Sequence, residues 1–260
     1  MKTVILAGGF GTRLSEYTED IPKPMVPIGG RPMIWHIMSI YAHFGHKDFI
    51  LALGYKAEYV KSYFLNYYTL YSDFSIDMAT GEKSTINRSL LDWKVTLMDT
   101  GLNTMTGGRL LRLAPQLRFE TFMCTYGDGV SNIDIDQLLT FHRSHGKLVT
   151  MTLARPSARF GVVETGENNN VKAFREKPVD SEGWVNAGFF VMEPAFLKYI
   201  ENDSTMLERE PLELAAKDGE LMAYHHKDFW KCMDMKRDVE ELNKMWVNDV
   251  APWKCNEIKI

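Results

Sequence analysis

The chain opens with a short apolar run that stops abruptly at a cluster of glycines. Residues Thr3 to Ala7 carry no charge, and Gly8, Gly9 and Gly11 follow within four positions. A short apolar run without polar alternation is typical of a strand that is buried on both faces of a parallel sheet. Glycines at its carboxyl end let other groups approach the backbone closely. The first eleven residues therefore favour an α/β fold.

Strand and helix patterns alternate along the first half of the chain. A helical pattern begins near residue 32, where apolar residues recur at Ile34, Ile37, Met38 and Tyr41, and Gly45 ends it. Further strands are expected at 48–53, 94–98 and 121–125, and further helices at 57–67, 108–117 and 135–145. This alternation predicts βαβ units and a mostly parallel sheet.

The pattern changes after about residue 148. Short strands separated by turns are expected at 149–153, 161–164, 171–174 and 184–192, followed by an amphipathic helix at 234–247, whereas 69–92 has no clear pattern. We predict a single domain over residues 1–260, with an α/β, Rossmann-like, mostly parallel mixed sheet flanked by helices. Its first half, about 1–130, is of the nucleotide-binding type, and its second half, about 131–260, contains a smaller sheet region.

Composition excludes several classes of function. The 260 residues include 30 Lys and Arg against 34 Asp and Glu, a formal net charge of −4. Such a balance gives no overall attraction to nucleic acid or to an anionic membrane, so we expect neither as a partner. No run approaches the roughly 18 apolar residues of a membrane span. Three scattered cysteines without C-x-x-C spacing indicate free thiols in a reducing cytoplasm.

The glycine-rich loop carries the first indication of chemistry. Backbone N–H groups of such a loop can surround an anion, and Arg13 adds a forked cation suited to phosphate oxygens. Lys23 supplies a second cation between two prolines. The loop lacks the Gly-Lys-Ser/Thr of a Walker A motif, and Leu14 stands where the dinucleotide fingerprint needs its third glycine. Phosphate binding is favoured over the alternative, a tight turn with two surface cations.

Several segments together resemble the sugar-1-phosphate nucleotidyltransferases. The matching segments span about residues 1–240 and are Gly8 to Leu14, Lys23 to Met25, Asp99 to Gly101, Thr106 to Arg109, Tyr126 to Gly129, Phe174 to Pro178, Asn186 to Phe190 and Phe229 to Asp234. Ser15-Glu16, residues 30–38 and residues 54–56 are most similar to the members that join CTP to glucose 1-phosphate. Ser15-Glu16 replaces the Pro-x-Thr of the thymidylyl- and uridylyltransferases.

The resemblance implies a reaction and a set of site residues. The phosphate of glucose 1-phosphate would attack the α-phosphorus of CTP, with Mg²⁺ as cofactor. Catalytic roles fall to Arg13, Lys23, Asp128 and Asp234, and the last two would be the metal ligands. Nucleotide contacts fall to Leu6, Ala7, Gly8, Gly9, Phe10, Gly11, Thr12, Arg13, Lys23, Thr104, Arg109 and Gly127. Sugar-phosphate contacts, in the second half, fall to Glu176, Lys177, Asn186, Ala187 and Gly188. The family commonly forms homo-oligomers, hexamers among them.

Three other functions remain open at this stage. UTP or dTTP could replace CTP in the same reaction. A non-catalytic sensor of nucleotide sugars would be expected to lack catalytic residues, yet Asp128, Asp234, Arg13 and Lys23 are all present. A dinucleotide oxidoreductase would need the missing third glycine. Asp128 between two glycines is also compatible with an ordinary turn, and Arg109 with a surface charge at the start of a helix.

Overall fold

A seven-stranded sheet forms the centre of the molecule. We describe a computed structural model of the chain over residues 1–87, 91–156, 162–165, 171–175 and 183–255. The strand order is β14-β10-β13-β8-β1-β4-β7. Its strands are β1 (Lys2–Ala7), β4 (Asp48–Leu53), β7 (Lys94–Asp99), β8 (Phe122–Tyr126), β10 (Val149–Ala154), β13 (Val185–Met192) and β14 (Leu221–His225). Strands from both halves of the chain thus share one sheet, as the α/β prediction requires.

Most neighbouring strands run parallel. β1 pairs in parallel with both β4 and β8, β4 with β7, and β10 with β14. Only β13 runs against its two neighbours within this sheet, since it pairs antiparallel with β8 and β10. The sheet is therefore mixed and mostly parallel, and the predicted fold class is confirmed.

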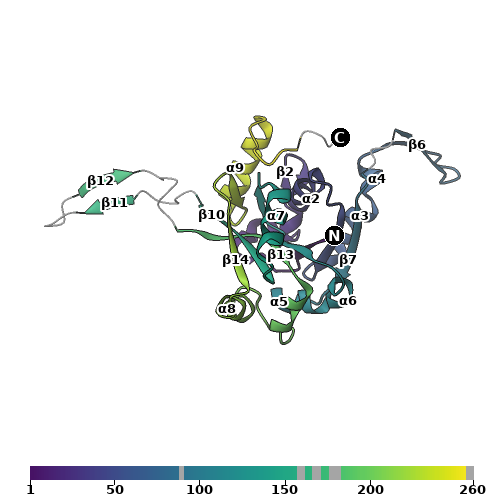
Figure 1. Ribbon diagram of the computed structural model, residues 1–260. Helices are drawn as coiled ribbons and strands as arrows, with labels where there is room; N and C mark the ends of the chain where they lie inside the picture. The colour runs from purple at the N-terminus through teal and green to yellow at the C-terminus, as the bar shows by residue number, and fades with distance from the viewer. Residues whose placement is uncertain (88–90, 157–161, 166–170, 176–182, 256–260) are drawn as a thin grey trace.

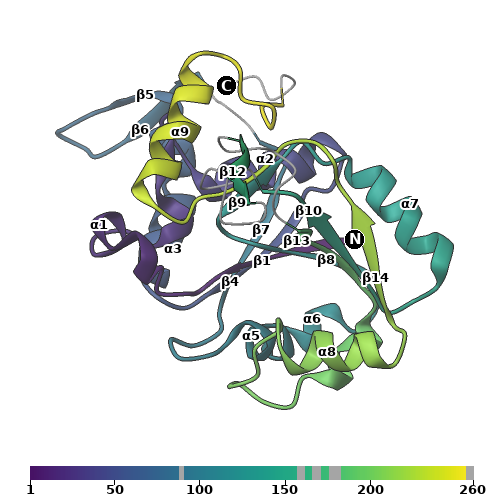
Figure 2. The same ribbon diagram turned by 90° about the vertical axis from the view of Figure 1, so that its left-hand side faces the viewer.

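Helices cover both faces of the sheet (Figures 1 and 2). Successive residues of β1 point to opposite faces, because side chains alternate along a strand. Ile5 packs on the side of α2 (Met33–His43), α3 (Ala57–Leu65), α7 (Ile135–His145) and α9 (Lys236–Val247). Val4 and Leu6 pack on the side of α5 (Thr106–Arg112), α6 (Ala114–Leu117) and α8 (Glu210–Lys217). The uncharged residues 3–7 of the first strand are buried on both faces for this reason.

Shorter elements complete the fold. They are α1 (Ser15–Thr18), α4 (Tyr67–Leu70), β2 (Pro27–Ile28), β3 (Arg31–Pro32), β5 (Asp73–Ile76), β6 (Lys83–Asn87), β9 (Gly129–Ser131), β11 (Val162–Thr165), β12 (Val171–Arg175), β15 (Trp230–Cys232) and the 3-10 helices Thr12–Leu14, Lys23–Met25 and Pro194–Tyr199. The β5–β6 and β11–β12 hairpins extend away from the body of the molecule in Figure 1. In the described parts of the chain, no helix has the length and apolar character needed to cross a membrane.

Two expectations about secondary structure needed revision. The single helix predicted at 108–117 is two short helices, α5 and α6, that meet at Leu113. Pro115 lies in the first turn of α6, where its missing N–H has no intrahelical partner to lose. The unpatterned stretch 69–92 contains the hairpin of β5 and β6, whose residues are all exposed. A strand without a buried face shows no alternation of apolar and polar residues, which explains why the pattern was missing.

Candidate active site

Two strand ends meet at the centre of the sheet. β1 and β8 are parallel neighbours, and Leu6 lies opposite Tyr126 in their register. The glycine loop after β1 and the Gly127-Asp128 turn after β8 therefore leave the same edge of the sheet side by side. In open α/β sheets, this edge at the carboxyl ends of the strands is where ligands bind.

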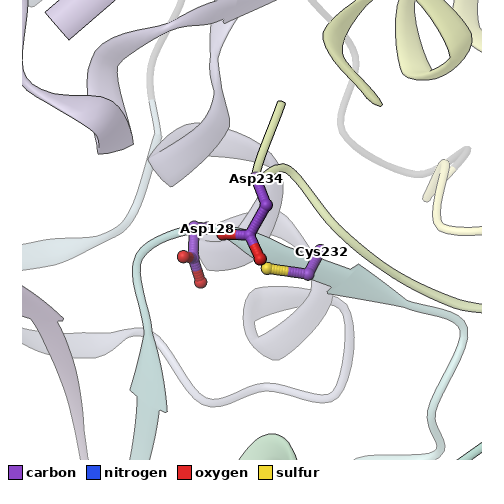
Figure 3. Close-up of side chains that lie close together, drawn as sticks. All are labelled: Asp128, Cys232 and Asp234. Carbon is purple, nitrogen blue, oxygen red and sulfur yellow. The ribbon is translucent and has the colours of Figure 1, made fainter. Parts of the chain in front are cut away.

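A short antiparallel strand pair brings Asp234 to the same place. Cys232 of β15 lies opposite Gly129 of β9, and the N–H of Met233 donates to the carbonyl oxygen of Asp128 over 2.8 Å. One ligand atom each from Asp128, Cys232 and Asp234 lie within 4.8 Å of one another (Figure 3). Two carboxylates that are far apart in the sequence thus face one small volume.

Two cations bind this pair of carboxylates. Lys23 Nζ donates to Asp128 Oδ2 over 2.6 Å and to Asp234 Oδ1 over 2.7 Å. Arg13 donates to Asp234 Oδ2 over 2.8 Å. The Lys23 side chain is 10% exposed, whereas that of Arg13 is 71% exposed. The structure therefore gathers all four residues that were predicted to be catalytic into one ion-pair cluster, with Arg13 on its open side.

Lys23 remains charged despite its burial. Burial acts to lower its pKa, but the charge of Asp128, the neighbouring Cys232 and hydrogen bonds to Asp128 and Asp234 outweigh it and raise the pKa above the ordinary value. Pro22 and Pro24 flank Lys23 at the start of its 3-10 helix. Because proline fixes its own φ, this segment holds the lysine backbone firmly.

The donor set fits Mg²⁺. A magnesium ion in a protein usually takes one or two carboxylates and completes its octahedron with phosphate oxygens and water. Asp128 and Asp234 supply the two carboxylates at an accessible cleft. Burial raises the pKa of the Cys232 thiol, and the charge of Asp128 adds to this effect. A protonated thiol is a poor ligand for a hard cation, so Cys232 is a neighbour of this site rather than a magnesium ligand.

The ion-pair cluster forms part of the wall of a cleft of about 1780 Å³. A small-molecule site typically encloses roughly 300–1,000 Å³, so this cleft has room for two substrates. Predicted site residues that line it are Leu6, Ala7, Gly8, Gly9, Phe10, Gly11, Arg13, Lys23, Thr104, Arg109, Gly127, Asp128, Asn186, Ala187 and Asp234. Thr12 and Gly188 are described but do not line the cleft, and Glu176 and Lys177 lie outside the described residues.

The shape of the glycine loop depends on missing side chains. Gly11 has φ 67°, in the left-handed region, and a Cβ there would lie 2.9 Å from Thr18 Cγ2 and 3.0 Å from Lys23 Cβ. At Gly8, a Cβ would overlap the guanidinium of Arg109. Glycine is required at both positions because the loop backbone packs directly against neighbouring side chains.

Arg109 ties this loop to the adjacent strands. Its side chain donates to the carbonyl oxygens of Gly8, Leu53 and Gly101, over 2.9, 2.9 and 2.8 Å, and to the Thr100 hydroxyl over 2.7 Å. Arg109 is 3% exposed, and burial lowers its pKa. The alternative of an ordinary surface charge is thus excluded. The contact of Arg109 with a nucleotide base stays a prediction.

Asn186 lines the cleft from β13, which lies on the other side of β8 from β1. Its Oδ1 accepts a hydrogen bond from the N–H of Gly188 over 2.9 Å, and its Nδ2 donates to the Tyr126 hydroxyl over 3.3 Å. Gly188 has φ 79°, and a Cβ there would overlap the Tyr126 ring. Gly188 does not itself line the cleft, and the absence of a side chain at this position leaves space for the Tyr126 ring.

Sequence reasoning missed several charged residues that line the cleft, and Glu208 is one of them. It lines the cleft, and its carboxylate accepts hydrogen bonds from the hydroxyls of Tyr126 and Thr106. Glu208 precedes α8, a helix that was not predicted, and it belongs to no recognisable motif. A single glutamate outside a motif carries no signal of its own, so only the chain's path through space could reveal it.

The chain is similar to known proteins in both sequence and fold. The sequence model of the nucleotidyl transferase family matches residues 2–247. Glucose-1-phosphate cytidylyltransferase of Salmonella typhi is 47% identical over 99% of this chain and 100% of its own length. The probable glucose-1-phosphate cytidylyltransferase of Bacillus subtilis (strain 168) is 44% identical over 98% of this chain and 99% of its own length. The crystal structure of HddC from Yersinia pseudotuberculosis in complex with GMP-PN superposes with a TM-score of 0.67. It covers 94% of this chain and 99% of that chain at 22% sequence identity, so the two proteins share the fold.

Proposed function

The chain belongs to the nucleotidyl transferase family, and we propose that it is a glucose-1-phosphate cytidylyltransferase, which converts CTP and glucose 1-phosphate into CDP-glucose and pyrophosphate. The observation that carries this proposal is the near full-length identity of 47% and 44% to two cytidylyltransferases. The cluster of Arg13, Lys23, Asp128 and Asp234 supports it, because the cluster supplies the charges that phosphoryl transfer requires.

The reaction brings two polyanions together. A phosphate oxygen of glucose 1-phosphate forms a bond to the α-phosphorus of CTP, while the bond from that phosphorus to the bridging β-phosphate oxygen breaks and pyrophosphate leaves. The attacking oxygen is already anionic at neutral pH, so no side chain has to remove a proton. Catalysis then depends on positioning and on neutralising charge.

Lys23 and Arg13 are placed to supply that neutralisation. Both cations are paired with the Asp128–Asp234 carboxylates before substrate arrives. When bound by these carboxylates, Mg²⁺ would withdraw charge from phosphate oxygens and help orient them. Lys23 could then exchange a carboxylate for a phosphate oxygen, and Arg13, on the open side, could reach the departing pyrophosphate. Both retain a partner of opposite charge throughout.

The remaining predicted residues would divide between the two substrates. The glycine loop with Thr104 and Gly127 would hold the nucleotide. Asn186 and Ala187 of β13 would hold the sugar. We retain Glu176 as a sugar contact and Lys177 as the cation that binds the sugar phosphate, both on the basis of the motif alone. Residues 1–130 would thus serve the nucleotide and 131–260 the sugar phosphate, within one domain.

Pyrophosphate release tests this proposal. Purified protein with Mg²⁺ and glucose 1-phosphate is assayed with CTP, UTP, dTTP and GTP in turn, and we expect the largest kcat/KM with CTP. Faster release with UTP or dTTP would mean that the protein catalyses the same reaction with that nucleotide in place of CTP. Absence of release with every triphosphate, from protein that still binds CTP, would favour the non-catalytic sensor.

Two further properties are part of the proposal. We expect a homo-oligomer, a hexamer by resemblance, and sedimentation velocity checks this by mass. We also expect a cytoplasmic location, because the three cysteines are scattered through the sequence without C-x-x-C spacing, which indicates thiols in a reducing compartment. Cell fractionation checks the location.

A further inference from the structure

Glu208 is held rigidly at the wall of the cleft. Its Oε2 accepts a hydrogen bond from the Thr106 hydroxyl over 2.6 Å, and its Oε1 accepts one from the Tyr126 hydroxyl over 2.7 Å. Thr106 starts α5 and Tyr126 ends β8, so two independent elements fix the two carboxylate oxygens. A carboxylate offers about four acceptor positions. Two hydroxyl donors therefore leave Glu208 with capacity for a further donor from the cleft.

The segment that carries Glu208 is packed tightly on α5. The N–H of Met105 donates to the carbonyl oxygen of Asp203 over 2.8 Å, and Arg112 forms an ion pair with the Asp203 carboxylate. A Cβ on Gly107 would lie 2.7 Å from the carbonyl oxygen of Thr205, so the two backbones are in direct contact. This close packing fixes the backbone from which the Glu208 side chain extends.

The hydrogen bonds that lead to Glu208 have a defined direction. Burial raises the pKa of the Tyr126 hydroxyl, and the charge of Glu208 raises it further, so Tyr126 stays protonated and donates to Glu208. Asn186 donates in turn to the Tyr126 hydroxyl. Asn186 thus donates to Tyr126, Tyr126 donates to one oxygen of Glu208, and Thr106 donates to the other oxygen. This series of hydrogen bonds presents an anionic acceptor beside an amide group. Groups of this kind suit a ligand with several hydroxyls.

Resting on the proposed function, we propose that Glu208 is a specificity-determining residue of the sugar subsite, whose carboxylate accepts a hydrogen bond from a ring hydroxyl of the hexose. An anionic acceptor repels the phosphates of both substrates, which leaves the hydroxyls and the cytosine amino group as donors. The hexose offers four hydroxyls, each of which donates and accepts, against two hydroxyls on the ribose and one amino group on the base. Asn186, assigned above to the sugar, belongs to the same hydrogen-bonded chain as Glu208.

Substitution of Glu208 combined with deoxygenated substrates tests the inference. Glu208→Gln keeps the size of the side chain and removes its charge. We expect kcat/KM for glucose 1-phosphate to fall about 10- to 100-fold, mainly through KM, with the KM for CTP unchanged, because a hydrogen bond to a charged acceptor is lost. The 2-, 3-, 4- and 6-deoxyglucose 1-phosphates are compared in turn. For the analogue that lacks the hydroxyl bound by Glu208, wild type and Glu208→Gln should become equal.

Matched variants separate recognition from folding. Glu210→Gln changes an exposed glutamate two positions away and should leave every kinetic constant within about twofold of wild type. Tyr126→Phe removes one hydroxyl that holds Glu208, so its effect should be smaller than that of Glu208→Gln and should not add to it in the double variant. Thermal unfolding shows whether each variant is folded.

Four outcomes would overturn the inference. An equal loss with every deoxy analogue would mean that Glu208 reads no hydroxyl, and a changed preference between CTP and UTP would assign it to the base. Calorimetric titration of glucose 1-phosphate in the presence of a non-hydrolysable CTP analogue measures sugar binding without turnover. If the wild-type protein binds no glucose 1-phosphate, both the inference and the proposed function are overturned. If Glu208→Gln binds the sugar phosphate as well as wild type does, the inference alone is overturned.

Discussion

At the scale of single residues, the site depends on charges that neutralise one another. Asp234 is 7% exposed and Lys23 8% exposed, and an unpaired charge at either position would lack the water that normally solvates it. Their mutual contacts supply each with a partner of opposite charge inside the cleft wall. Removing one member therefore deprives at least one other member of a partner, and effects on activity are not additive across the cluster.

Asp128→Asn is expected to lower kcat at least about 100-fold, since it removes one of the two carboxylates proposed to bind Mg²⁺ and leaves Lys23 paired with Asp234 alone. Pyrophosphate release over a range of Mg²⁺ concentrations measures this effect, and the Mg²⁺ needed for half-maximal rate should rise. Asp92→Asn is the control, because Asp92 is 73% exposed, forms an ion pair with Lys47 and does not line the cleft. Full turnover by Asp128→Asn would refute the metal assignment.

His36 couples the stability of the fold to pH. It is 1% exposed, and burial lowers its pKa from 6.5 to about 4. The unfolded chain binds a proton near pH 6.5, whereas the folded chain does so only near pH 4. Above pH 6.5 His36 is neutral in both states and does not lower the free energy of unfolding. As the pH falls from 6.5 to 4, this free energy decreases by about 3 kcal/mol, because the unfolded chain takes up the proton first.

Urea unfolding at several pH values measures this dependence. His36→Gln should flatten the fall in the free energy of unfolding between pH 6.5 and pH 4, whatever its effect at neutral pH. The same substitution at His43, an exposed residue of α2, should keep the wild-type slope. A slope that is identical in His36→Gln and wild type would show that His36 is not the group responsible.

At the scale of elements, the cleft is shaped where short elements contact one another without side chains between them. The α5 helix is one example, because Gly107 and Gly108 in its first turn let the backbone of residues 203–205 lie directly against it. The hydrogen bond from Gly108 N–H to the carbonyl oxygen of Thr205 fixes this contact. The Thr-Gly-Gly-Arg motif thus combines a packing role for its glycines with the side-chain contacts of Thr106 and Arg109.

Gly108→Ala distinguishes packing from helix propensity. Propensity alone predicts a gain of about 1 kcal/mol from alanine within a helix. A Cβ on Gly108 would overlap backbone atoms of Asp203, however, so we expect a loss of about 1–3 kcal/mol in the free energy of unfolding. Denaturant unfolding gives the sign directly. Gly183→Ala, where a Cβ meets no atom within 4 Å, should change stability by less than about 0.5 kcal/mol, and a stabilised Gly108→Ala would contradict the packing contact.

At the scale of the whole molecule, the cleft is formed by segments from the entire length of the chain. Its lining extends from Leu6 in the first strand to Met245 in the last helix. A ligand bound there contacts both halves of the fold and is lost when the chain unfolds, so binding must stabilise the native state.

Mg²⁺ with CTP should therefore raise the melting temperature. At a ligand concentration of 100 times Kd the stabilisation is about 2.7 kcal/mol, which corresponds to roughly 5–10 °C for a chain of this size. Differential scanning fluorimetry measures the shift, and EDTA should remove most of it together with all pyrophosphate release. An equal shift with and without EDTA would mean that CTP binds without the carboxylate pair.

Much of the architecture was predictable because it follows from local patterns. The uncharged run of β1, the helical period of α2 and the boundaries of α7, predicted and observed at 135–145, depend on residues close together in the sequence. The hairpin of β5 and β6 and helix α8 were not predicted, since short or fully exposed elements show weak periodicity. The order of strands in the sheet likewise depends on pairing between distant segments.

The sequence by itself determined the fold class and, through its motifs, the residues of the ion-pair cluster, because glycines, cations and aspartates at fixed spacings limit the possible chemistry. Only the tertiary structure decided that Lys23 bridges Asp128 and Asp234, that Arg109 holds strand ends together and that Glu208 faces the cleft. These contacts join residues 56 to 211 positions apart. Their physical basis is the pairing of strands and the close packing of backbones, which no local pattern encodes.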